Sequence, residues 1–498
     1  MTGQAPRRTG LVLACAAGVA GVAGFAPAGL APLAILALAA LFHLASRATP
    51  GGAFRLGFAW GLGHFAVGVS WVYVSLHDFG MMPAPLAALA TALFCAYLAL
   101  FPAAAMWAMQ RLGGGAGVRL LAAGPGAWTL AEWVRLWLFT GFPWLTLGYS
   151  QIDTPLAGFA PVAGVFAASL AASVVAGALA ALPALRGRAR AAAVAAALAV
   201  AAAGAALGRI EWTAPSGPPV TVALVQGNIP QDLKFDPARY RVTLETYLRL
   251  VGGTQARLIV LPETAVPRFL DLVEPGFVEA LAAHARTAGG DLLLGAPVRA
   301  GERYYNAIVS LGSAPGQAYA KSHLVPFGEF VPPGFGWIVA VLRIPLSDFA
   351  RGSAGQRPLA VAGERVAPNV CYEDAFGEEI IRMLPEATLL VNASNVAWFG
   401  DSLAPAQHLE ISRMRALETG RFLLRATNTG VTAIVDDRGR VAARLPAFTE
   451  GVLAGEAQGR TGATPFVRFG NAPAVALASL LLASAAIAAR RVRRPPTL

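Results

Sequence analysis

Residues 365–379, RVAPNVCYEDAFGEE, contain the feature from which the polar part of this chain can be interpreted. An apolar run of the kind found in buried strands ends at Cys371, and acidic residues follow directly. Cys371 is one of only three cysteines among 498 residues. A chain so poor in cysteine that places one at a strand end raises the question of what the thiol does there.

Similar apolar runs occur throughout the polar part of the chain. Apolar runs ended by turn residues predict short buried strands in PPVTVALVQGN, ARLIVLPET, GDLLLGAP, NAIVSLG, ATLLVNASN and TAIVDDRGR. Helical spacing of apolar residues occurs between them in PARYRVTLETYLRLVGG, GFVEALAAHARTAGG and HLEISRMRALETGRFL. This alternation predicts a layered α/β domain over residues 211–470, with sheets covered by helices. Periodicity does not give the strand order.

The composition of the whole chain is that of a membrane protein. Hydrophobic residues make up 56% and charged residues 13%, with a mean hydropathy of +0.56, whereas about a quarter of a soluble protein is charged. We expect a multi-pass α-helical bundle of about eight spans, at residues 10–26, 28–45, 56–76, 84–108, 117–140, 156–183, 190–208 and 472–489. The predicted domains are a seven-span bundle over 1–210, a catalytic domain over 211–470, and a helix with a basic tail over 471–498.

The arginines predict the orientation of these spans. Arg7 and Arg8 precede the first span, further arginines occupy every second loop, and RRVRRPP follows the last span. The alternate loops, SLHDFGMMPAP and GFPWLTLGYSQIDTP, contain no lysine or arginine. Because cytoplasmic loops are enriched in these residues, both termini are expected in the cytoplasm and residues 211–470 in the periplasm of a bacterial inner membrane. A cleaved signal peptide is the alternative for the first span, but the spans that follow at once favour an uncleaved helix.

The charge and cysteine content exclude several functions. The net charge of +11 is explained largely by cytoplasmic arginines, and no RNA or DNA motif indicates a nucleic-acid partner. The chain has no glycine-rich phosphate loop, so ATP is not implied, and no cofactor is expected. Cys15 and Cys95 fall within spans, which leaves Cys371 without a disulfide partner in the exported domain. An unpaired thiol in an oxidising compartment indicates a chemical role.

Three chemically distinct residues follow predicted strands. Glu263 follows LIVLP, Lys321 follows GQAYA, and Cys371 follows VAPNV. Singly, each has an ordinary interpretation as a turn cap, a solvated lysine or a buried cysteine. Together they supply what acyl transfer through a thiol needs: a nucleophile, a base and a cation that stabilises the oxyanion. We therefore expect them to converge at one edge of the sheets.

These residues also carry a resemblance to known proteins. The nitrilase superfamily, whose domain is an αββα sandwich, has Glu, Lys and Cys signatures that resemble LPETAVP, AKSHLVPFGEFVP and NVCYEDAFGE. The apolipoprotein N-acyltransferase family within it is similar almost end to end, through GVSWVYVSLHDFG, GFPWLTLGYSQ, LVQGNIPQDLKF and SNVAWFGDSLAPAQHLEISRMRALETGRFLLRATNTG.

The resemblance implies a two-step reaction at the membrane. Cys371 would take an acyl chain from a phospholipid, typically phosphatidylethanolamine, as a thioester. The α-amino group of the diacylglyceryl-cysteine of an apolipoprotein would then attack that thioester. By the same resemblance Glu263 is the general base and Lys321 the oxyanion stabiliser.

Supporting residues follow from the same motifs. Glu329 matches the family's second essential glutamate and is expected to orient Lys321 or relay protons. Tyr372 and Glu373 match the two residues after the nucleophile, and the backbone N–H of Tyr372 is an expected oxyanion donor. Phe235 stands where the family often has Trp, which leaves a ring but no indole N–H. Val396 stands where it often has Asp, so a carboxylate role is in doubt there.

A lid at the bilayer surface is expected from FVPPGFGWIVAVLRIPL, residues 330–346, because a thioester must be kept from water. The alternative is that these apolar side chains pack in the core. The expected lipid contacts are Phe235, Phe335, Trp337, Ile338 and Trp398.

Two other groups of polar residues are interpreted as structural. His323 and His408 lack the spacing of a zinc signature, so no metal is expected. Glu132 and Arg135 lie one helical turn apart inside a span, which allows a mutual salt bridge.

Two rival functions use the same sequence. A membrane-tethered nitrilase-type amidohydrolase would let water attack the thioester and would release ammonia or an amine. A transporter or scaffold with an inactive periplasmic domain would be indifferent to Cys371→Ala. The apolar segment at 330–346 and the extended resemblance disfavour the first, and the presence of all three catalytic residue types disfavours the second.

Overall fold

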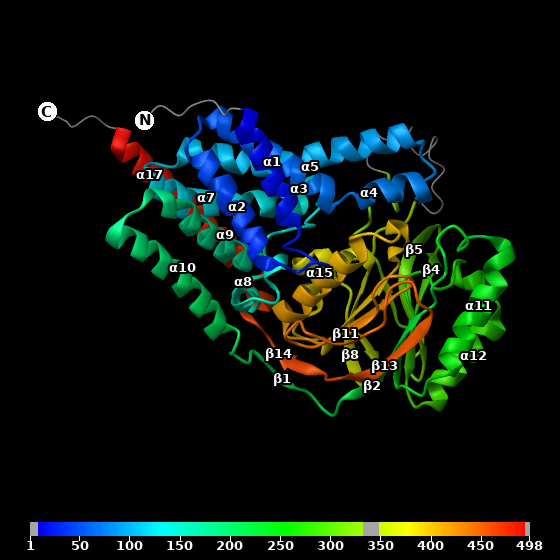
Figure 1. The fold of residues 1–498 in the computed structure, drawn as a ribbon. Coiled ribbons are helices and arrows are strands. Elements are labelled where there is room, and N and C mark those ends of the chain that lie inside the picture. Colours follow the sequence, from blue (N-terminus) through cyan, green and yellow to red (C-terminus); the bar gives the residue numbers. More distant parts are fainter. Residues whose placement is uncertain (1–7, 332–347, 494–498) are drawn as a thin grey trace. The chain divides into compact units, whose positions relative to one another are not determined.

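The computed structural model describes residues 8–331 and 348–493, which divide into two compact units (Figure 1). Unit 1 comprises Met1–Tyr73, Ala84–Ile210 and Arg468–Leu498. Unit 2 comprises Val74–Pro83 and Glu211–Val467. A ten-residue segment from the N-terminal part of the chain thus belongs to the unit that contains Glu263, Lys321 and Cys371.

Unit 1 is built from α-helices. Its helices are α1 (Arg8–Val22), α2 (Ala31–Ser46), α3 (Pro50–Gly68), α4 (Trp71–Val74, shared with unit 2), α5 (Ala84–Leu112), α6 (Ala116–Val118), α7 (Gly124–Trp137), α8 (Ala160–Ala163), α9 (Val165–Ala181), α10 (Gly187–Leu207), α16 (Pro465–Phe469, at the border with unit 2) and α17 (Ala472–Arg493). In α5, α9 and α10, alanine, leucine and valine occupy all sides of the helix, as expected for helices that meet both lipid and one another.

The number of helices that could cross a bilayer is smaller than predicted. Within the described residues four helices are long and apolar enough: Ala84–Leu112, Val165–Ala184, Gly187–Leu207 and Ala472–Arg491. A fifth results if the pair Pro50–Gly68 and Trp71–Phe79, bent by 52°, is one span. The prediction of about eight spans is not confirmed, because α1, α2 and α7 have only 15, 16 and 14 residues and a straight crossing takes roughly 20.

Glu132 and Arg135, on α7, both bind the irregular loop that follows this helix. Glu132 Oε1 accepts a hydrogen bond from the backbone N–H of Leu147 at 2.8 Å, and Arg135 donates to the carbonyl of Phe142 at 2.8 Å. The loop exposes backbone groups that a helix would pair internally, and apolar surroundings make unpaired groups costly. These contacts support a structural role for both charges, each of which reaches the loop.

Unit 2 contains two six-stranded mixed sheets. Their strand orders are β13-β2-β3-β4-β5-β6 and β12-β11-β10-β9-β8-β7, and β1 pairs with β14 in a separate ribbon. The strands are β1 (Thr213–Pro215), β2 (Val220–Gln226), β3 (Leu258–Val260), β4 (Asp291–Ala300), β5 (Arg303–Gly312), β6 (Ala318–Ala320), β7 (Leu359–Val361), β8 (Glu364–Val370), β9 (Leu389–Ser394), β10 (Leu423–Thr427), β11 (Ala433–Val435), β12 (Val441–Arg444), β13 (Gly451–Ala457) and β14 (Arg460–Gly462). Strands β2, β3 and β4 are parallel, as are β8, β9 and β10, and the outer pairs are antiparallel.

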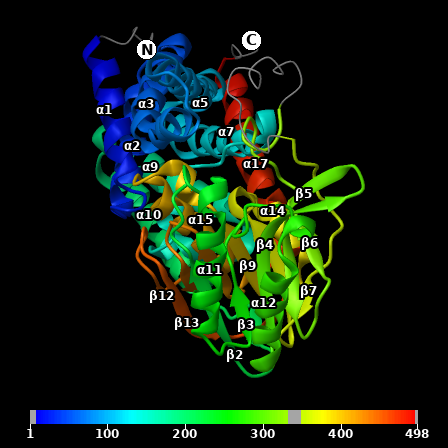
Figure 2. The same ribbon diagram turned by 90° about the vertical axis from the view of Figure 1, so that its right-hand side faces the viewer.

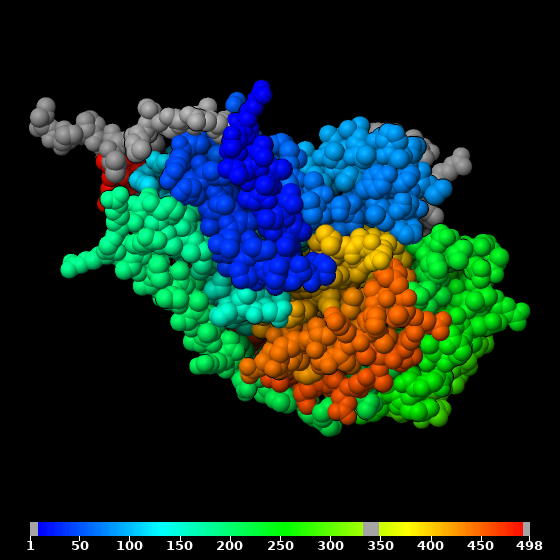
Figure 3. Space-filling model, viewed as in Figure 1, coloured from blue at the N-terminus to red at the C-terminus, as the bar shows by residue number. Residues whose placement is uncertain are grey.

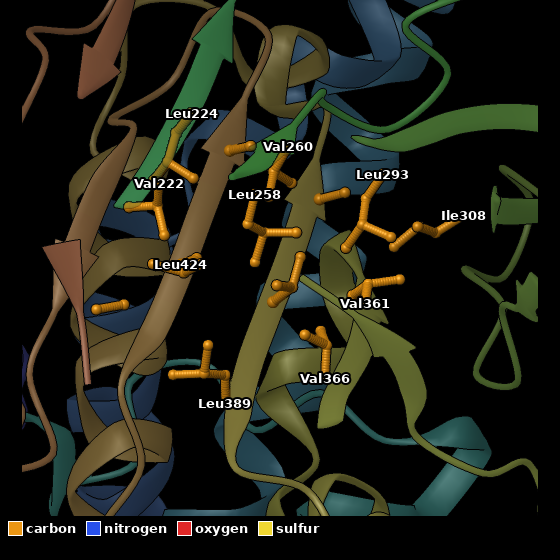
Figure 4. Packing of buried hydrophobic residues seen from close by; sticks show 14 of the residues in the cluster. Val222, Leu224, Leu258, Val260, Leu293, Ile308, Val361, Val366, Leu389 and Leu424 are labelled. Carbon is orange, nitrogen blue, oxygen red and sulfur yellow. The ribbon is translucent and has the colours of Figure 1, made fainter. Parts of the chain in front are cut away.

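The two sheets pack face to face, with helices on their outer faces. Alternate residues of β2 point to opposite sides, so Val222 and Leu224 enter the core between the sheets while Ala223 and Val225 meet the helices. Figure 4 shows this central core. The helices α11 (Pro237–Gly252) and α12 (Pro275–Thr287) lie side by side over the first sheet (Figure 2).

The second sheet is covered by α14 (Gly377–Ile380) and α15 (Ala404–Thr419). Pro405 lies in the first turn of α15, and Gly420 ends the helix in the left-handed conformation, at φ 62°. The edge strands β12 and β13 of the two sheets lie next to each other and form part of one continuous surface (Figure 3). The predicted αββα sandwich is therefore confirmed for unit 2.

Candidate active site

The predicted catalytic residues stand where strands of the sandwich end. Glu263 follows β3 after Leu261 and Pro262, Lys321 follows β6, and Cys371 follows β8 directly. All three side chains are buried. Ligands of open α/β sheets bind beyond the carboxyl ends of the strands, and β3 and β8 present theirs here.

Lys321 lies between two carboxylates. Its Nζ is 2.8 Å from Glu329 Oε2 and 3.4 Å from Glu263 Oε1. The side chain of Asn306, on β5, joins the same carboxylates, because its Nδ2 donates to Glu263 at 2.7 Å and to Glu329 at 2.8 Å. Lys321 is 1% exposed, so its ammonium is held by protein groups instead of water. Glu329 is thus the nearer anchor of Lys321.

The charged groups around Lys321 keep one another ionised although they are buried. Burial alone would raise the pKa of Glu263, but the ammonium groups of Lys321 and Lys234 hold that pKa below its ordinary value. Burial would likewise lower the pKa of Lys321, but Glu329 and Glu263 raise it. The ground state therefore contains an ionised glutamate beside an ionised lysine.

Cys371 has a backbone conformation that cysteine rarely adopts. Its φ is 54°, in the left-handed region that favours glycine. The residue begins a short 3-10 helix, Cys371–Ala375, directly at the end of β8. Chain direction thus reverses sharply at the thiol, as in other strand-to-helix turns that present a nucleophile. Strain of this kind persists only where surrounding contacts maintain it.

The thiol of Cys371 is protonated at rest and lies within the field of the charged cluster. Burial raises its pKa to about 12, and the charge of Glu263 contributes in the same direction, whereas Lys321 and Ser394 oppose it. Glu263 and the end of β9 are also linked, since the N–H of Asn395 donates to Glu263 Oε2 at 2.8 Å. A proton acceptor and a cation therefore both act on the thiol, as acyl transfer requires.

A buried polar network holds the backbone of Cys371. The carbonyl of Cys371 accepts hydrogen bonds from Asn392 Nδ2 at 3.1 Å and from His408 Nε2 at 3.2 Å. His408 Nε2 also lies 2.7 Å from Asp374 Oδ1, and Arg425 donates to Asn392 Oδ1 at 2.6 Å. His408 is thus used in fixing the turn at Cys371.

Glu373 connects the lysine loop to the cysteine turn. Its Oε1 accepts from the backbone N–H groups of Ser322 at 2.7 Å and His323 at 3.0 Å. Its Oε2 accepts from the N–H of Val370 at 2.7 Å, and the hydroxyl of Tyr319 donates to both oxygens at 2.9 Å. The residues flanking Lys321 and Cys371 are therefore fixed to one carboxylate.

Tyr372 lies in an aromatic group beside Cys371. Its ring contacts His323 and Phe376 edge to face, with centroid distances of 5.8 and 5.1 Å. His323 stacks on Phe376 at 3.6 Å and pairs with Glu379 at 3.2 Å. Within residues 8–331 and 348–491, no group of three or more His, Cys, Asp or Glu side chains is arranged to hold a metal ion.

Of the five residues predicted to contact lipid, two lie in the part of the chain that the structure describes. Phe235 is 37% exposed on the loop between β2 and α11. Trp398 packs against the segment 74–83, where Phe79 meets its ring at 6.4 Å and Ser75 donates to its carbonyl at 2.7 Å. Phe335, Trp337 and Ile338 lie outside the described residues. Val396 is buried against Gly430, a site without room for the solvation of a carboxylate.

Two residues of the cluster were missed by the sequence analysis. Asn306 interrupts the apolar strand run YYNAIVSLG, and a buried amide in such a run is a sign of a partner. Lys234 directly precedes Phe235, is 3% exposed, and donates from Nζ to the carbonyl of Glu263 at 3.2 Å.

Comparison with known families matches both parts of the chain. Residues 17–179 match the apolipoprotein N-acyltransferase N-terminal domain, and residues 221–466 match carbon-nitrogen hydrolase. Among solved structures, a CN-hydrolase superfamily protein from Xanthomonas campestris is similar with 20% identity and a TM-score of 0.38, over 52% of this chain and 97% of that one.

Curated relatives are similar over most of both chains. Apolipoprotein N-acyltransferase of Nitrosomonas europaea is 52% identical over 457 residues, which cover 90% of each chain. The proteins of the same name from Chromobacterium violaceum and Methylococcus capsulatus are 48% and 46% identical, over 86% and 88% of this chain and 84% and 88% of theirs. The chain belongs to the apolipoprotein N-acyltransferase family.

Proposed function

We propose that this protein transfers an acyl chain from a membrane phospholipid to the α-amino group of a diacylated apolipoprotein, through a thioester on Cys371. One relative that carries the name of this activity is similar over nine-tenths of both chains. The observation that carries the proposal is the joint action of Glu263 and Lys321 on a thiol held in a left-handed turn.

The first half-reaction forms the thioester. As Sγ of Cys371 attacks the ester carbonyl of the phospholipid, its proton passes to Glu263. The ammonium of Lys321 and the backbone N–H of Tyr372 stabilise the negative charge that develops on the carbonyl oxygen. The ester C–O bond then breaks, and Glu263 returns the proton to the leaving oxygen. The products are a lysophospholipid and the acylated enzyme.

The second half-reaction transfers the acyl chain to the acceptor. The neutral α-amino group of the diacylglyceryl-cysteine attacks the thioester carbonyl, and Glu263 accepts a proton from the attacking nitrogen. When the C–S bond breaks, the thiolate recovers that proton. Glu329 and Asn306 keep Lys321 in place throughout, and Glu373 positions the two loops without contacting substrate.

The substrates require a membrane setting, and the apolar helices of unit 1 are compatible with one. In this proposal residues 1–210 form seven spans, residues 471–498 form the eighth with its basic tail, and residues 211–470 are the periplasmic catalytic domain. Phosphatidylethanolamine is the acyl donor. Phe235 and Trp398 contact lipid, and no cofactor takes part.

The full-length protein in phosphatidylethanolamine vesicles, supplied with a synthetic diacylglyceryl-cysteine peptide, tests this function. We expect the peptide to gain one amide-linked acyl chain, with stoichiometric lysophospholipid, as measured by mass spectrometry. A peptide with an acetylated α-amino group is the matched control and should remain unchanged. Release of free fatty acid with no acylated peptide would instead identify a hydrolase.

Cys371→Ala separates this proposal from a non-catalytic role. The variant should bind vesicles and unfold at the temperature of the wild type but form no product. Product formation by Cys371→Ala at the wild-type rate would contradict the proposal.

A further inference from the structure

Lysine is almost absent from this chain. Of 39 lysine and arginine residues in the sequence only two, Lys234 and Lys321, are lysines. Arginine serves at exposed ion pairs such as Arg241–Glu245, and also at fully buried sites such as Arg425 on β10. The two lysines are buried and belong to the same site. A compact ammonium, which a planar guanidinium does not replace, is therefore needed at both positions.

Lys234 contacts the catalytic base through its backbone. It lies on the loop between β2 and α11, and its Nζ donates to the carbonyl of Glu263 at 3.2 Å. The charges of Glu263 and Cys371 both act on its ammonium and oppose the effect of burial, which lowers the pKa of Lys234 to about 8. The mechanism described above assigns this cation no part.

The formal charges of Glu263, Glu329 and Lys321, the three groups of the mechanism nearest one another, balance only when Lys234 is added to them. The carboxylates of Glu263 and Glu329 carry two negative charges, and the ammonium groups of Lys321 and Lys234 carry two positive charges. When the proton of Cys371 moves to Glu263, the negative charge moves to sulfur and the total remains zero. Without Lys234 the same buried site would carry a net negative charge, which disfavours a thiolate.

We propose that Lys234 is a second fixed cation of the active site, which positions Glu263 through its carbonyl and stabilises the thiolate of Cys371 by its charge. It is a positioning residue and does not contact the reacting carbonyl. This inference rests on the proposed function only for its consequence in acyl transfer, because the reactivity of the thiol can be measured without a lipid substrate.

Several other charged groups surround the thiol. Glu263, Lys321 and Glu329 act on it directly, and Arg425 acts on it from β10. The remaining titratable groups packed against this turn are Glu373, Asp374 and His408. A test must leave all of these unchanged, so it should vary residue 234 alone.

The test is the rate at which iodoacetamide alkylates Cys371 in the full-length protein, with Cys15 and Cys95 replaced by alanine. Lys234→Met removes the charge and the hydrogen bond, whereas Lys234→Gln removes the charge but keeps a donor for the carbonyl of Glu263. The matched control is Arg239→Met, which removes one exposed positive charge five positions later.

Both Lys234 variants should react about tenfold more slowly at pH 7, where Lys234 is still charged, because loss of a nearby positive charge raises the pKa of a thiol by about one unit. Arg239→Met should react like the parent protein. Thioester formation from phospholipid should show a comparable fall in kcat with an unchanged KM.

Several results would overturn the inference. The first is an unchanged alkylation rate in Lys234→Gln. The second is a rise in KM alone, which would assign Lys234 to substrate binding. The third is failure of both variants to fold, which would assign Lys234 a structural role. If only Lys234→Met fails to fold, Lys234→Gln decides. The protein could show the expected slower alkylation in both Lys234 variants and yet transfer no acyl chain. That result would leave this inference standing and refute the proposed function alone.

Discussion

At the scale of single residues, the proposed mechanism depends on holding Cys371 in an unfavourable conformation. A non-glycine residue in the left-handed region costs about 1–3 kcal/mol where its environment imposes it. The environment here is the pair of hydrogen bonds from Asn392 and His408 to the carbonyl of Cys371. These bonds explain why residues distant from the thiol in sequence, on β9 and α15, should affect its reactivity.

Asn392→Ala tests this support. Removal of the amide leaves the carbonyl with one partner fewer, so we expect about tenfold slower thioester formation and a loss of about 1–3 kcal/mol in the free energy of unfolding. The matched control is Asn369→Ala, which removes a neighbouring amide of the same network that bonds Val391 and Asn392 instead of Cys371. Equal losses of activity in the two variants would show a general effect of stability.

The pH dependence of the reaction should reflect the depressed pKa of Glu263. A carboxyl group whose pKa is lowered in the folded state stays ionised to lower pH, and its function is lost only as the pH falls through that lowered value. The acid limb of acyl transfer is therefore expected below about pH 4.3, the ordinary pKa of glutamate. Rates measured in vesicles from neutral to acidic pH, with folding followed in parallel, give this limb. An acid limb well above that value would contradict the assignment of Glu263 as base.

At the scale of elements, strands and helices were predictable where their apolar residues are continuous. The runs at 220–226, 291–294 and 389–394 are strands, and the helical patterns beginning at Pro237 and His408 fall largely in α11 and α15. The order of the strands was not predictable, because the sequence of a strand buried on both faces does not indicate which strands lie beside it. The β7–β8 hairpin was not predicted, because its first strand, Leu359–Val361, is only three residues long and is followed by a tight turn.

The candidate site was predictable in its chemistry but not in its supports. Glu263, Lys321 and Cys371 end strands and differ from the apolar runs before them, so they stand out in the sequence. Asn306 and Lys234 act through contacts with Glu263 that no spacing encodes.

Glu373 tests how elements are joined at the site. Glu373→Gln would place an amide among N–H groups that all donate, so at least one donor would lose its acceptor. We expect a loss of about 1–3 kcal/mol in the free energy of unfolding and slower thioester formation. Glu379→Gln, which alters a carboxylate on α14 paired with His323, should change both quantities much less. A variant Glu373→Gln with wild-type stability would refute the joining role.

At the scale of the whole molecule, the segment 74–83 shows that neighbours in sequence can belong to different structural units. It lies between helices of unit 1 but packs with unit 2, through Ser75 and Phe79 against Trp398. Hydropathy could not assign such a short segment to a unit, because Ser75 and its partner Trp398 lie 323 positions apart in the sequence.

The orientation proposed for the chain predicts which positions are accessible from outside the inner membrane. In a protein without Cys15 and Cys95, Glu302→Cys in unit 2 should react with a membrane-impermeant maleimide in spheroplasts. Ala189→Cys, in the arginine-containing first turn of α10, should react only after lysis. Both positions are exposed within their own units. The reverse pattern would place residues 211–470 in the cytoplasm and contradict the orientation.

The central claim is that the sulfur of Cys371 carries an acyl chain between two lipids, and trapping that intermediate tests it most directly. The purified protein would be incubated with acyl-labelled phosphatidylethanolamine, and the peptide containing Cys371 examined by mass spectrometry before and after addition of the diacylglyceryl-cysteine peptide. We predict one acyl group on Cys371, removed by hydroxylamine and discharged to the added peptide as an amide. An acylated product formed while Cys371 never carries label would contradict the account.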